Sequence, residues 1–410
     1  MTWSYGELQQ AVQSAAAIRR RRRLQPVGGK GDKIFPPTYP ADERGAPPRH
    51  VYETRRIEGT DVVCVLIDSV QSQANRLEEA LERAAEEKRI SLPRIYVDFA
   101  STGLNSVPDV SVLTAPHRIF DAILRDSNLG GVAFGKSAVG EALKKAKPHD
   151  ATAILKAAPT ALLFGCWNST GEGGGLGAKF ARAIVSEIIG IGVPVEGVTS
   201  RRTGEVTLRT AGRRTGSRID PLGVVRSVEV FKGDAGWSTD QKEAGKGAKK
   251  VRPSEVNHGN IAPSVDPLGV TCDYAEQTAV ITLAGLRRLR FGKDESRNAA
   301  AREYLAALGL VALAEADRQG YALRSRCDLV CEGEAPLELV AFDGTTRRID
   351  LDADAAVRLH EEAFQAAAKA GFELDPNPVK LMPQDKLVEI VSKSQTKALA
   401  DEGGAEDKNE

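Results

Sequence analysis

The feature that most constrains the fold is an apolar segment that runs directly into a dense polar cluster. Six consecutive apolar residues, Val62 to Ile67, predict a strand buried on both faces. Asp68 or Ser69 then predicts the cap of a following helix. The polar side chains at the start of that helix are Gln71, Ser72, Gln73, Asn75 and Arg76. Two interpretations stay open, a capped and solvated helix start or a binding site.

The other predicted elements mix strands and helices without a regular βαβ repeat. Strands are expected at about 21–27, 62–68, 94–99, 161–167, 206–209, 224–231, 280–283, 323–330 and 337–342. Helices are expected at 71–89, 118–125, 179–189, 297–316 and 353–370. Runs of this kind favour an α+β domain with an antiparallel sheet.

Composition narrows the class of protein. The 410 residues are 41% hydrophobic, enough to bury a substantial core. No apolar run approaches the roughly 18 residues that span a bilayer, and the first residues do not resemble a signal peptide, so we expect a cytoplasmic protein without membrane contact. Five scattered cysteines predict no disulfide framework. Cys327 and Cys331 lack a second ligand pair at zinc spacing, so no metal or cofactor is expected.

The formal net charge of zero hides an asymmetry between the two ends of the chain. Residues 1–292 carry 41 Lys and Arg against 32 Asp and Glu, whereas residues 293–410 carry 15 against 24. A polyanion is therefore attracted to the first part and repelled by the second. The acidic end, residues 396–410, is expected to be a disordered tail.

Two basic segments are candidates for phosphate contacts. Arg19, Arg20, Arg21, Arg22 and Arg23 form an unbroken run, followed by a glycine-containing segment with Lys30. Guanidinium groups bind phosphates bidentately, although a solvated face or a nuclear address also explains such a run. The second segment alternates like a hairpin ribbon with glycine punctuation. Its candidate arginines are Arg201, Arg202, Arg213, Arg214 and Arg218.

A glycine-rich loop suggests a further anion site. The loop begins at Gly171 and leads into the helix expected at 179–189, whose N-terminal end would attract a phosphate. Trp167, just before the loop, has the right chemistry to stack on a base. An ordinary turn and a buried core tryptophan are the competing interpretations.

The segment Gly130 to Ser137 matches the phosphate-binding pattern GxxxxGKS. That pattern binds phosphate only when a strand directly precedes the loop and a helix follows it. Helical rather than strand spacing precedes it here, so a P-loop nucleotide hydrolase is kept as an alternative function only. The five histidines lie far apart, and none belongs to a recognisable nucleophile motif.

Eight segments together resemble one family, the RAMP-superfamily backbone subunit of type I-G (formerly I-U) CRISPR Cascade complexes, the Csb-one branch of the Cas-seven proteins. The resemblance spans roughly Leu24 to Val330. The segments are Phe35–Tyr39, Asp68–Glu78, His117–Ser127, Phe164–Thr170, Ser186–Gly190, Asp220–Gly223, Pro253–Ile261 and Leu286–Phe291.

The resemblance implies a ferredoxin-like palm, the RNA recognition motif fold, with large insertions called fingers and thumb. Residues 1–200 would form the palm with inserted helical finger segments, and 201–260 a thumb-like basic insertion. Residues 261–395 would hold the rest of the palm and an acidic α/β segment.

The implied function is a non-catalytic subunit that polymerises along crRNA and presents it for pairing with target DNA. The implied partners are crRNA, target DNA, further copies of the chain, a Cas-five/Cas-six fusion subunit, a large PAM-sensing subunit and a recruited helicase-nuclease. Related type III subunits cut RNA with a loop Asp, so a cleaving Asp is a second alternative. Besides the arginines and Lys30 above, the expected RNA-binding residues are Gln71, Gln73, Asn75, Arg76, His117, Arg118, Arg125, Trp167, Asn168, Ser169, Lys179, Arg182, His258 and Asn260.

Overall fold

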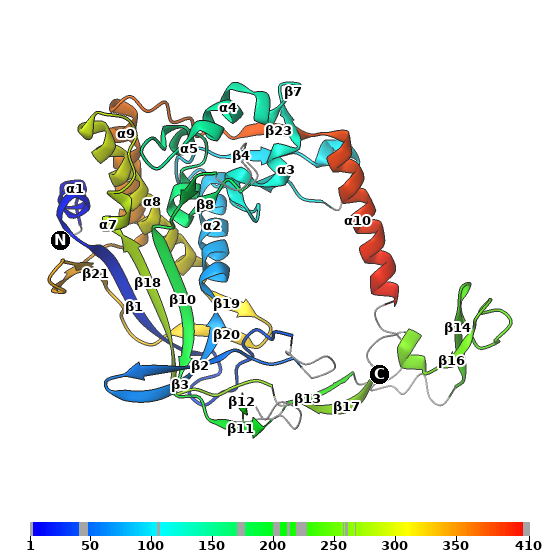
Figure 1. The fold of residues 1–410 in the computed structure, drawn as a ribbon. Coiled ribbons are helices and arrows are strands. Elements are labelled where there is room, and N and C mark those ends of the chain that lie inside the picture. The colour runs from blue at the N-terminus through cyan, green and yellow to red at the C-terminus, as the bar shows by residue number, and fades with distance from the viewer. Residues whose placement is uncertain are drawn as a thin grey trace. The chain divides into compact units, whose positions relative to one another are not determined.

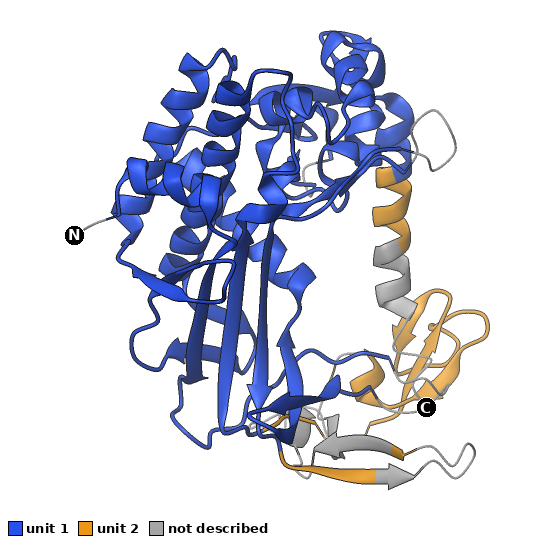
Figure 2. Ribbon diagram, turned by 60° about the vertical axis from the view of Figure 1, so that its left-hand side comes forward, with its two compact units in different colours: residues 1–193, 271–390 blue, residues 194–270, 391–410 orange. Residues whose placement is uncertain are grey.

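The computed structural model divides the chain into two compact units (Figure 2). Unit 1 comprises residues 1–193 and 271–390, and unit 2 comprises residues 194–270 and 391–410. The structure describes residues 3–40, 48–104, 107–169, 177–199, 206–210, 214–218, 228–256, 258, 261–266 and 268–404. Unit 2 contains the whole range of the expected thumb-like insertion, 201–260.

Unit 1 is built on a nine-stranded antiparallel sheet (Figure 1). The strand order is β19-β20-β1-β18-β10-β3-β2, and β21 pairs with both β1 and β22. The strands are β1 (Ala17–Pro26), β2 (Tyr52–Ile57), β3 (Thr60–Asp68), β10 (Ile184–Ile191), β18 (Tyr274–Thr282), β19 (Tyr321–Arg324), β20 (Cys327–Cys331), β21 (Leu337–Val340) and β22 (Thr346–Ile349). The strand predicted at 62–68 is therefore confirmed as β3.

Helices cover one face of this sheet, and on β18 they bury every second residue. They are α1 (Tyr5–Ser14), α2 (Val70–Glu86), α7 (Leu283–Leu286), α8 (Glu295–Gln319) and α9 (Ala353–Lys369). On β18 the residues facing α2 and α8 are buried, among them Ala275, Ala279 and Ile281. A Cβ atom on Gly309 of α8 would lie 2.9 Å from Ile281, so the glycine permits the close approach of helix and sheet.

The order in which the chain visits the sheet is simple despite the insertions. β1 leads through the β2-β3 hairpin and α2 to β10, and β10 leads to its neighbour β18. β18 then leads through α7 and α8 to β20. The spatial order of these four strands is β20-β1-β18-β10, each antiparallel to the next.

A second group of short elements in unit 1 lies, apart from β23, between α2 and β10 in sequence. Its five-stranded sheet has the order β5-β4-β23-β6-β7. The strands are β4 (Ile95–Val97), β5 (Val110–Ser111), β6 (Ser127–Leu129), β7 (Val132–Ala133) and β23 (Val379–Pro383). The helices are η1 (Ala100–Thr102), η2 (Arg118–Phe120), α3 (Ala122–Arg125), η3 (Phe134–Lys136), α4 (Ala138–Lys145), α5 (Thr152–Ala157) and α6 (Pro159–Phe164).

Unit 2 consists of small antiparallel sheets. Strands β11 (Val195–Thr199) and β12 (Val206–Thr210) pair, as do β13 (Arg214–Arg218) and β17 (Ile261–Asp266). A three-stranded sheet has the order β15-β14-β16, with β14 (Val230–Gly233), β15 (Gly236–Ser238) and β16 (Lys249–Val251), followed by η4 (Pro253–Val256). Helix α10 (Asp385–Gly404) begins in unit 1 and occupies residues 396–404 of the expected tail; residues 405–410 lie outside the described part.

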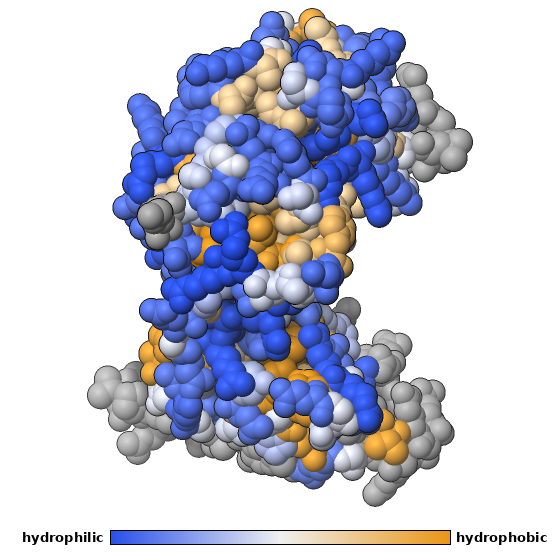
Figure 3. Space-filling model, turned by 90° about the vertical axis from the view of Figure 1, so that its left-hand side faces the viewer, coloured by the Kyte–Doolittle hydropathy of each residue, from blue (hydrophilic) through white to orange (hydrophobic). Residues whose placement is uncertain are grey.

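In the face drawn in Figure 3, hydrophilic side chains predominate and apolar ones form separate patches. No helix among the described residues is long and apolar enough to cross a membrane.

Two predicted elements are wrong. The strand expected at 161–167 is mostly helix α6, because Pro159 begins a helix of good helix formers that ends at Gly165 with φ +84°. The helix expected at 179–189 is instead the two strands β9 (Lys179–Phe180) and β10, since β10 lies between β18 and β3 and is rich in isoleucine.

Two others are interrupted. The helix expected at 118–125 divides into η2 and α3 because Asp121 caps a new helix, accepting from the Ile123 amide at 2.9 Å. The strand expected at 323–330 divides into the β19-β20 hairpin, which turns at Arg326 with φ +56°. In the strand expected at 224–231, β14 starts at Val230 and residues 219–227 lie outside the described part.

Packing of α9 on α8 generates a pH-dependent stability. His360 is fully buried beside the rings of Tyr304 and Phe364, and burial lowers its pKa from 6.5 to about 4. The unfolded chain therefore binds more protons between these two pH values. The free energy of unfolding should fall by about 3 kcal/mol as the pH drops from 6.5 to 4, with this contribution fully present above pH 7.

Urea denaturation of the wild type and His360→Leu at several pH values measures this effect. The difference between their unfolding free energies should change over that window, whereas the exposed His149→Gln should track the wild type. A constant difference between wild type and His360→Leu would contradict the assignment.

Candidate nucleic-acid interface

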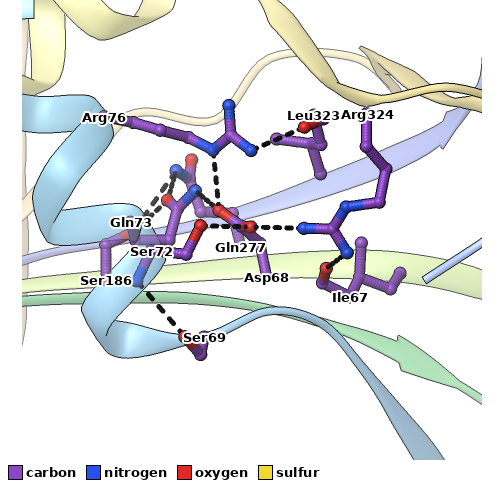
Figure 4. A network of polar contacts seen from close by, with 10 residues as sticks. All are labelled: Ile67, Asp68, Ser69, Ser72, Gln73, Arg76, Ser186, Gln277, Leu323 and Arg324. Carbon is purple, nitrogen blue, oxygen red and sulfur yellow. Dashed lines mark hydrogen bonds and ion pairs between the residues drawn. The ribbon is translucent and has the colours of Figure 1, made fainter. Parts of the chain in front are cut away.

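The polar cluster at the end of β3 is organised around one buried carboxylate (Figure 4). Asp68 has no exposed surface. Its Oδ1 accepts from Ser72 Oγ at 2.8 Å and from Arg324 at 3.2 Å. Its Oδ2 accepts from Gln73 Nε2 at 2.7 Å and from Arg76 Nε at 3.0 Å. Four donors from α2 and β19 therefore compensate the burial of this charge.

The network continues across the sheet through two glutamines. Gln73 Oε1 accepts from Ser186 Oγ at 2.8 Å and from Gln277 Nε2 at 2.9 Å. Gln277 Oε1 in turn accepts from Arg20 at 3.2 Å and from the Tyr321 hydroxyl at 2.9 Å. A single set of contacts thus joins β3, α2, β10, β18, β1 and β19.

This arrangement separates the α2 residues that the sequence grouped together. Gln73 is only 4% exposed, and both ends of its amide bond within the network. Arg76 is half-buried and also donates to the Leu323 carbonyl at 2.7 Å. Gln71 and Asn75 are exposed and lie one turn apart on α2. Their side chains, rather than that of Gln73, are placed to meet a ligand.

The five-arginine run is strand β1, so its side chains alternate between the two faces of the sheet. Arg20 and Arg22 lie on the helix-covered face and both pair with Asp317 of α8. Arg22 also donates to the Tyr321 hydroxyl at 2.7 Å. These two guanidinium groups hold α8 and β19 against the sheet.

Arg19, Arg21 and Arg23 lie on the opposite face of β1, here called the outer face. Arg19 pairs with Glu338 at 2.7 Å. Arg21 pairs with Glu276 at 2.9 Å, but its side chain stays 60% exposed. Glu276 itself is only 12% exposed, so a phosphate would contact the open surface of the Arg21 guanidinium and leave this ion pair in place.

Arg23 completes the outer face. Its guanidinium carbon lies 4.2 Å from the centroid of the Tyr274 ring, and no carboxylate partner is found for it among the described residues. Lys30, on the loop that follows β1, forms an ion pair with Glu332. The outer face therefore presents an exposed arginine held over an aromatic ring beside a second exposed arginine.

Arg118 joins three of the sequence segments. It donates to both oxygens of Glu78 of α2 at 2.6 and 2.8 Å, and to the Gly165 carbonyl at 3.0 Å. Its backbone is left-handed, with φ +52°. This conformation is unfavourable for a residue other than glycine, and the hydrogen bonds of its side chain must offset that cost. Glu78 is buried. Arg118 therefore positions the turn before Trp167 relative to α2 and is not free to bind a ligand itself.

The turn leads into a hairpin of β8 (Cys166–Trp167) and β9. Trp167 is 45% exposed, and Lys179 on the paired strand lies with its Nζ 4.1 Å from the ring centroid. Arg182 follows two residues after β9 and is half-buried. The helix expected at 179–189, whose N-terminus was to attract an anion, is strand here. The prediction of a phosphate site at that helix end is therefore wrong. Residues 170–176 of the glycine-rich loop lie outside the described part.

The remaining predicted residues of unit 1 are mostly exposed. His117 is exposed at the start of η2, and Arg125 is exposed and pairs with Asp126 at 3.0 Å. Ser169 is exposed and Asn168 half-buried, both directly after β8. Whether they contact RNA stays a prediction.

In unit 2 the structure describes only part of the predicted set. Arg214 and Arg218 lie at the two ends of β13, and His258 is exposed. Arg201, Arg202, Arg213 and Asn260 lie outside the described residues. His258 contacts Trp237. Sequence reasoning did not name Trp237 as a candidate residue. The available signal was a tryptophan within a polar, lysine-rich and glycine-rich segment.

The segment matching GxxxxGKS does not form a phosphate-wrapping loop. Gly130 and Gly131, both with positive φ, make the two-residue turn of the β6-β7 hairpin. Ser137 caps α4 by accepting from the Gly140 amide at 3.1 Å. Separately, no group of three metal-ligating side chains is found in the part of the chain that the structure describes.

The Asp68 network predicts a specific stability loss. Asp68→Asn removes the charge that Arg76 and Arg324 share, and we expect the free energy of unfolding to fall by about 2 to 4 kcal/mol. Asp61→Asn breaks an exposed ion pair with Arg56 and should cost less than about 0.5 kcal/mol. Chemical denaturation of both variants checks this, and equal losses would contradict the central role of Asp68.

The comparisons with known proteins agree with part of the sequence resemblance. No curated protein matches the chain. A family model described as CRISPR-associated protein GSU0053 matches residues 18–195, a range that runs from β1 through β10 and ends near the start of unit 2. The matched range includes the arginine strand, Asp68, Arg118 and the Trp167 hairpin. The chain is thus similar to a CRISPR-associated protein of the GSU0053 type, and the match supports a role in a CRISPR system.

Proposed function

We propose that this protein is a crRNA-binding backbone subunit of a type I CRISPR effector complex. The observation that carries the proposal is the outer face of β1, where Arg21 and Arg23 are exposed on a rigid central strand. The family match supports a CRISPR role for the same part of the chain. Guanidinium groups fixed on a sheet suit a ligand whose phosphates repeat at regular spacing.

The chain connectivity supports a ferredoxin-like palm as the core of unit 1. In that fold two strand-helix-strand units place the strands in the order 4-1-3-2. The strands β1, β10, β18 and β20, in chain order, have this arrangement, with α2 and α8 as the two helices. In this proposal the β2-β3 hairpin is an addition beside β10, and the helices leave the outer face of β1 for RNA.

Binding in this mode is independent of sequence. The spacer sequence of a guide varies, so the protein must contact phosphates and sugars and leave base edges for target DNA. The charge asymmetry, positive before residue 293, favours a polyanionic ligand on this part of the chain. We propose no catalytic role for the subunit.

The partners follow from the same proposal. They are crRNA, target DNA, further copies of this chain, a Cas-five/Cas-six fusion subunit, a large PAM-sensing subunit and a recruited helicase-nuclease. The basic residues 201–218 of unit 2 are proposed to act as the thumb that reaches the RNA next to a neighbouring copy.

The first test compares the two faces of β1. Arg21→Gln with Arg23→Gln should weaken binding of single-stranded RNA and reduce the slope of log affinity against log salt by about 1 to 2. Arg20→Gln with Arg22→Gln removes the same charge from the helix-covered face. This variant should lower the free energy of unfolding, but the molecules that remain folded should bind RNA with the wild-type slope of log affinity against log salt. Fluorescence anisotropy over a salt series measures both. An identical slope for the outer-face variant and the wild type would refute the role of the outer face.

The second test concerns assembly. If each copy contacts both RNA and its neighbour, binding should be cooperative and the mass of the complex should increase in steps as the RNA lengthens. Replacement of Arg201, Arg202 and Arg213 by Gln should reduce this cooperativity. Native mass spectrometry with RNAs of graded length decides it, and one copy per RNA at every length would exclude a filament-forming backbone subunit.

A further inference from the structure

A small sheet in unit 2 carries an exposed aromatic side chain in line with two lysines. Trp237 on β15 pairs directly with Lys232 on β14, and Lys232 pairs with Lys249 on β16. Directly paired residues of antiparallel strands point to the same face. Neighbouring strands lie about 4.8 Å apart, so the row extends about 10 Å from the indole to the outer lysine. We call these three residues the Trp237 row.

The tryptophan of this row is not buried as core. Its side chain is 51% exposed, whereas Trp3 is 5% exposed. His258 contacts the Trp237 ring edge-to-face, with ring centroids 5.0 Å apart. The His258 amide donates at 2.8 Å to the carbonyl of Pro253, the first residue of η4. The indole is therefore contacted by an anchored ring, and 51% of the Trp237 surface stays exposed.

The acidic residues of the segment do not compete for Lys249, because each is engaged elsewhere within 228–256. Glu229 pairs with Lys250, and the carboxylates of Asp234, Asp240 and Glu255 accept from backbone amides of the segment. Glu243 accepts from the Ser238 hydroxyl at 2.8 Å. Within the described residues Lys249 has no carboxylate partner. Lys249 thus keeps its positive charge on the same face of the sheet as the exposed indole.

Loop contacts hold the sheet in shape. The Asp234 carboxylate accepts from the Lys246 amide at 2.6 Å, and the Ala235 amide donates to the Ala244 carbonyl at 3.1 Å. Ala244, within the loop between β15 and β16, is buried. The orientation of the Trp237 row is therefore set by a folded element and does not depend on a ligand.

We infer that the Trp237 row binds an unpaired nucleotide, with its base stacked on Trp237 and an adjacent phosphate contacted by Lys249. Stacking on an aromatic side chain next to basic groups is the usual way in which proteins hold single strands without reading their sequence. This site lies in a different unit from the outer face of β1, so the inference deepens the proposed function by adding a second nucleic-acid contact. The same chemistry serves the guide RNA or a single DNA strand.

The experiment uses the full-length chain with two ligands. The first arm titrates a labelled single-stranded RNA into the free protein, and the second titrates a labelled single-stranded DNA into the RNA-loaded protein. In the arm whose strand contacts the row, Trp237→Ala should raise the dissociation constant about 10-fold. Trp237→Phe keeps an aromatic face, so its dissociation constant should lie within about 3-fold of the wild-type value. The arm affected identifies the strand.

Matched lysine variants separate a site from general charge. Lys249→Gln should weaken binding in the same arm and lower the salt slope by about 1. Lys250→Gln removes the same charge from the adjacent residue, which points to the opposite face and pairs with Glu229, so it should match the wild type. Equal effects of the two variants would overturn the row as a defined site.

A spectroscopic readout tests stacking directly. In a Trp167→Phe background, oligonucleotide should quench the fluorescence of Trp237, and an abasic oligonucleotide of equal length and charge should not. Unchanged affinity of Trp237→Ala in both arms, or equal quenching by the abasic strand, would refute the inference. Neither result alters the salt-slope test on Arg21 and Arg23, so failure of the row is distinguishable from failure of the proposed function.

Discussion

The burial of the Asp68 carboxylate is the constraint on which the rest of unit 1 depends. A charge without solvent exposure must be compensated by donors, and here they come from α2 and β19. Through Gln73 and Gln277 the same set of contacts reaches Ser186 of β10 and Arg20 of β1. The network therefore fixes the positions of segments more than 200 residues apart in sequence.

The position of β1 in this network gives its arginines two different roles. Arg20 and Arg22 satisfy Asp317 on the helix-covered face, and they secure the strand. Because side chains alternate along a strand, the same securing contacts hold Arg21 and Arg23 on the outer face. An arginine held in place loses less conformational entropy when it binds a phosphate than one on a free loop. The internal ion pairs thus support the proposed RNA contact.

Arg118 has a similar positioning role for the second candidate surface. By donating to Glu78 and to the Gly165 carbonyl, it joins α2 to the turn that presents Trp167. The Trp167 hairpin and the Trp237 row share one composition, an exposed aromatic ring with a cation in contact or on the neighbouring strand. On the outer face of β1, Arg23 lies over the half-buried ring of Tyr274. That composition suits a single strand of nucleic acid better than a small metabolite.

The sequence by itself determined much of this protein. The apolar run of β3, the cap that begins α2, the long helices α8 and α9 and the α+β class all follow from local pattern, because periodicity and capping are properties of neighbouring residues. Only the tertiary structure decided that residues 184–191 form a central strand, since pairing with β18 and β3 outweighs a local helical spacing. Tertiary contacts also decided that Gln73 and Arg118 face inward while Arg21, Arg23 and Trp237 stay exposed. The partners that bury a polar side chain are distant in sequence, so local pattern could name these residues but not assign each to the core or the surface.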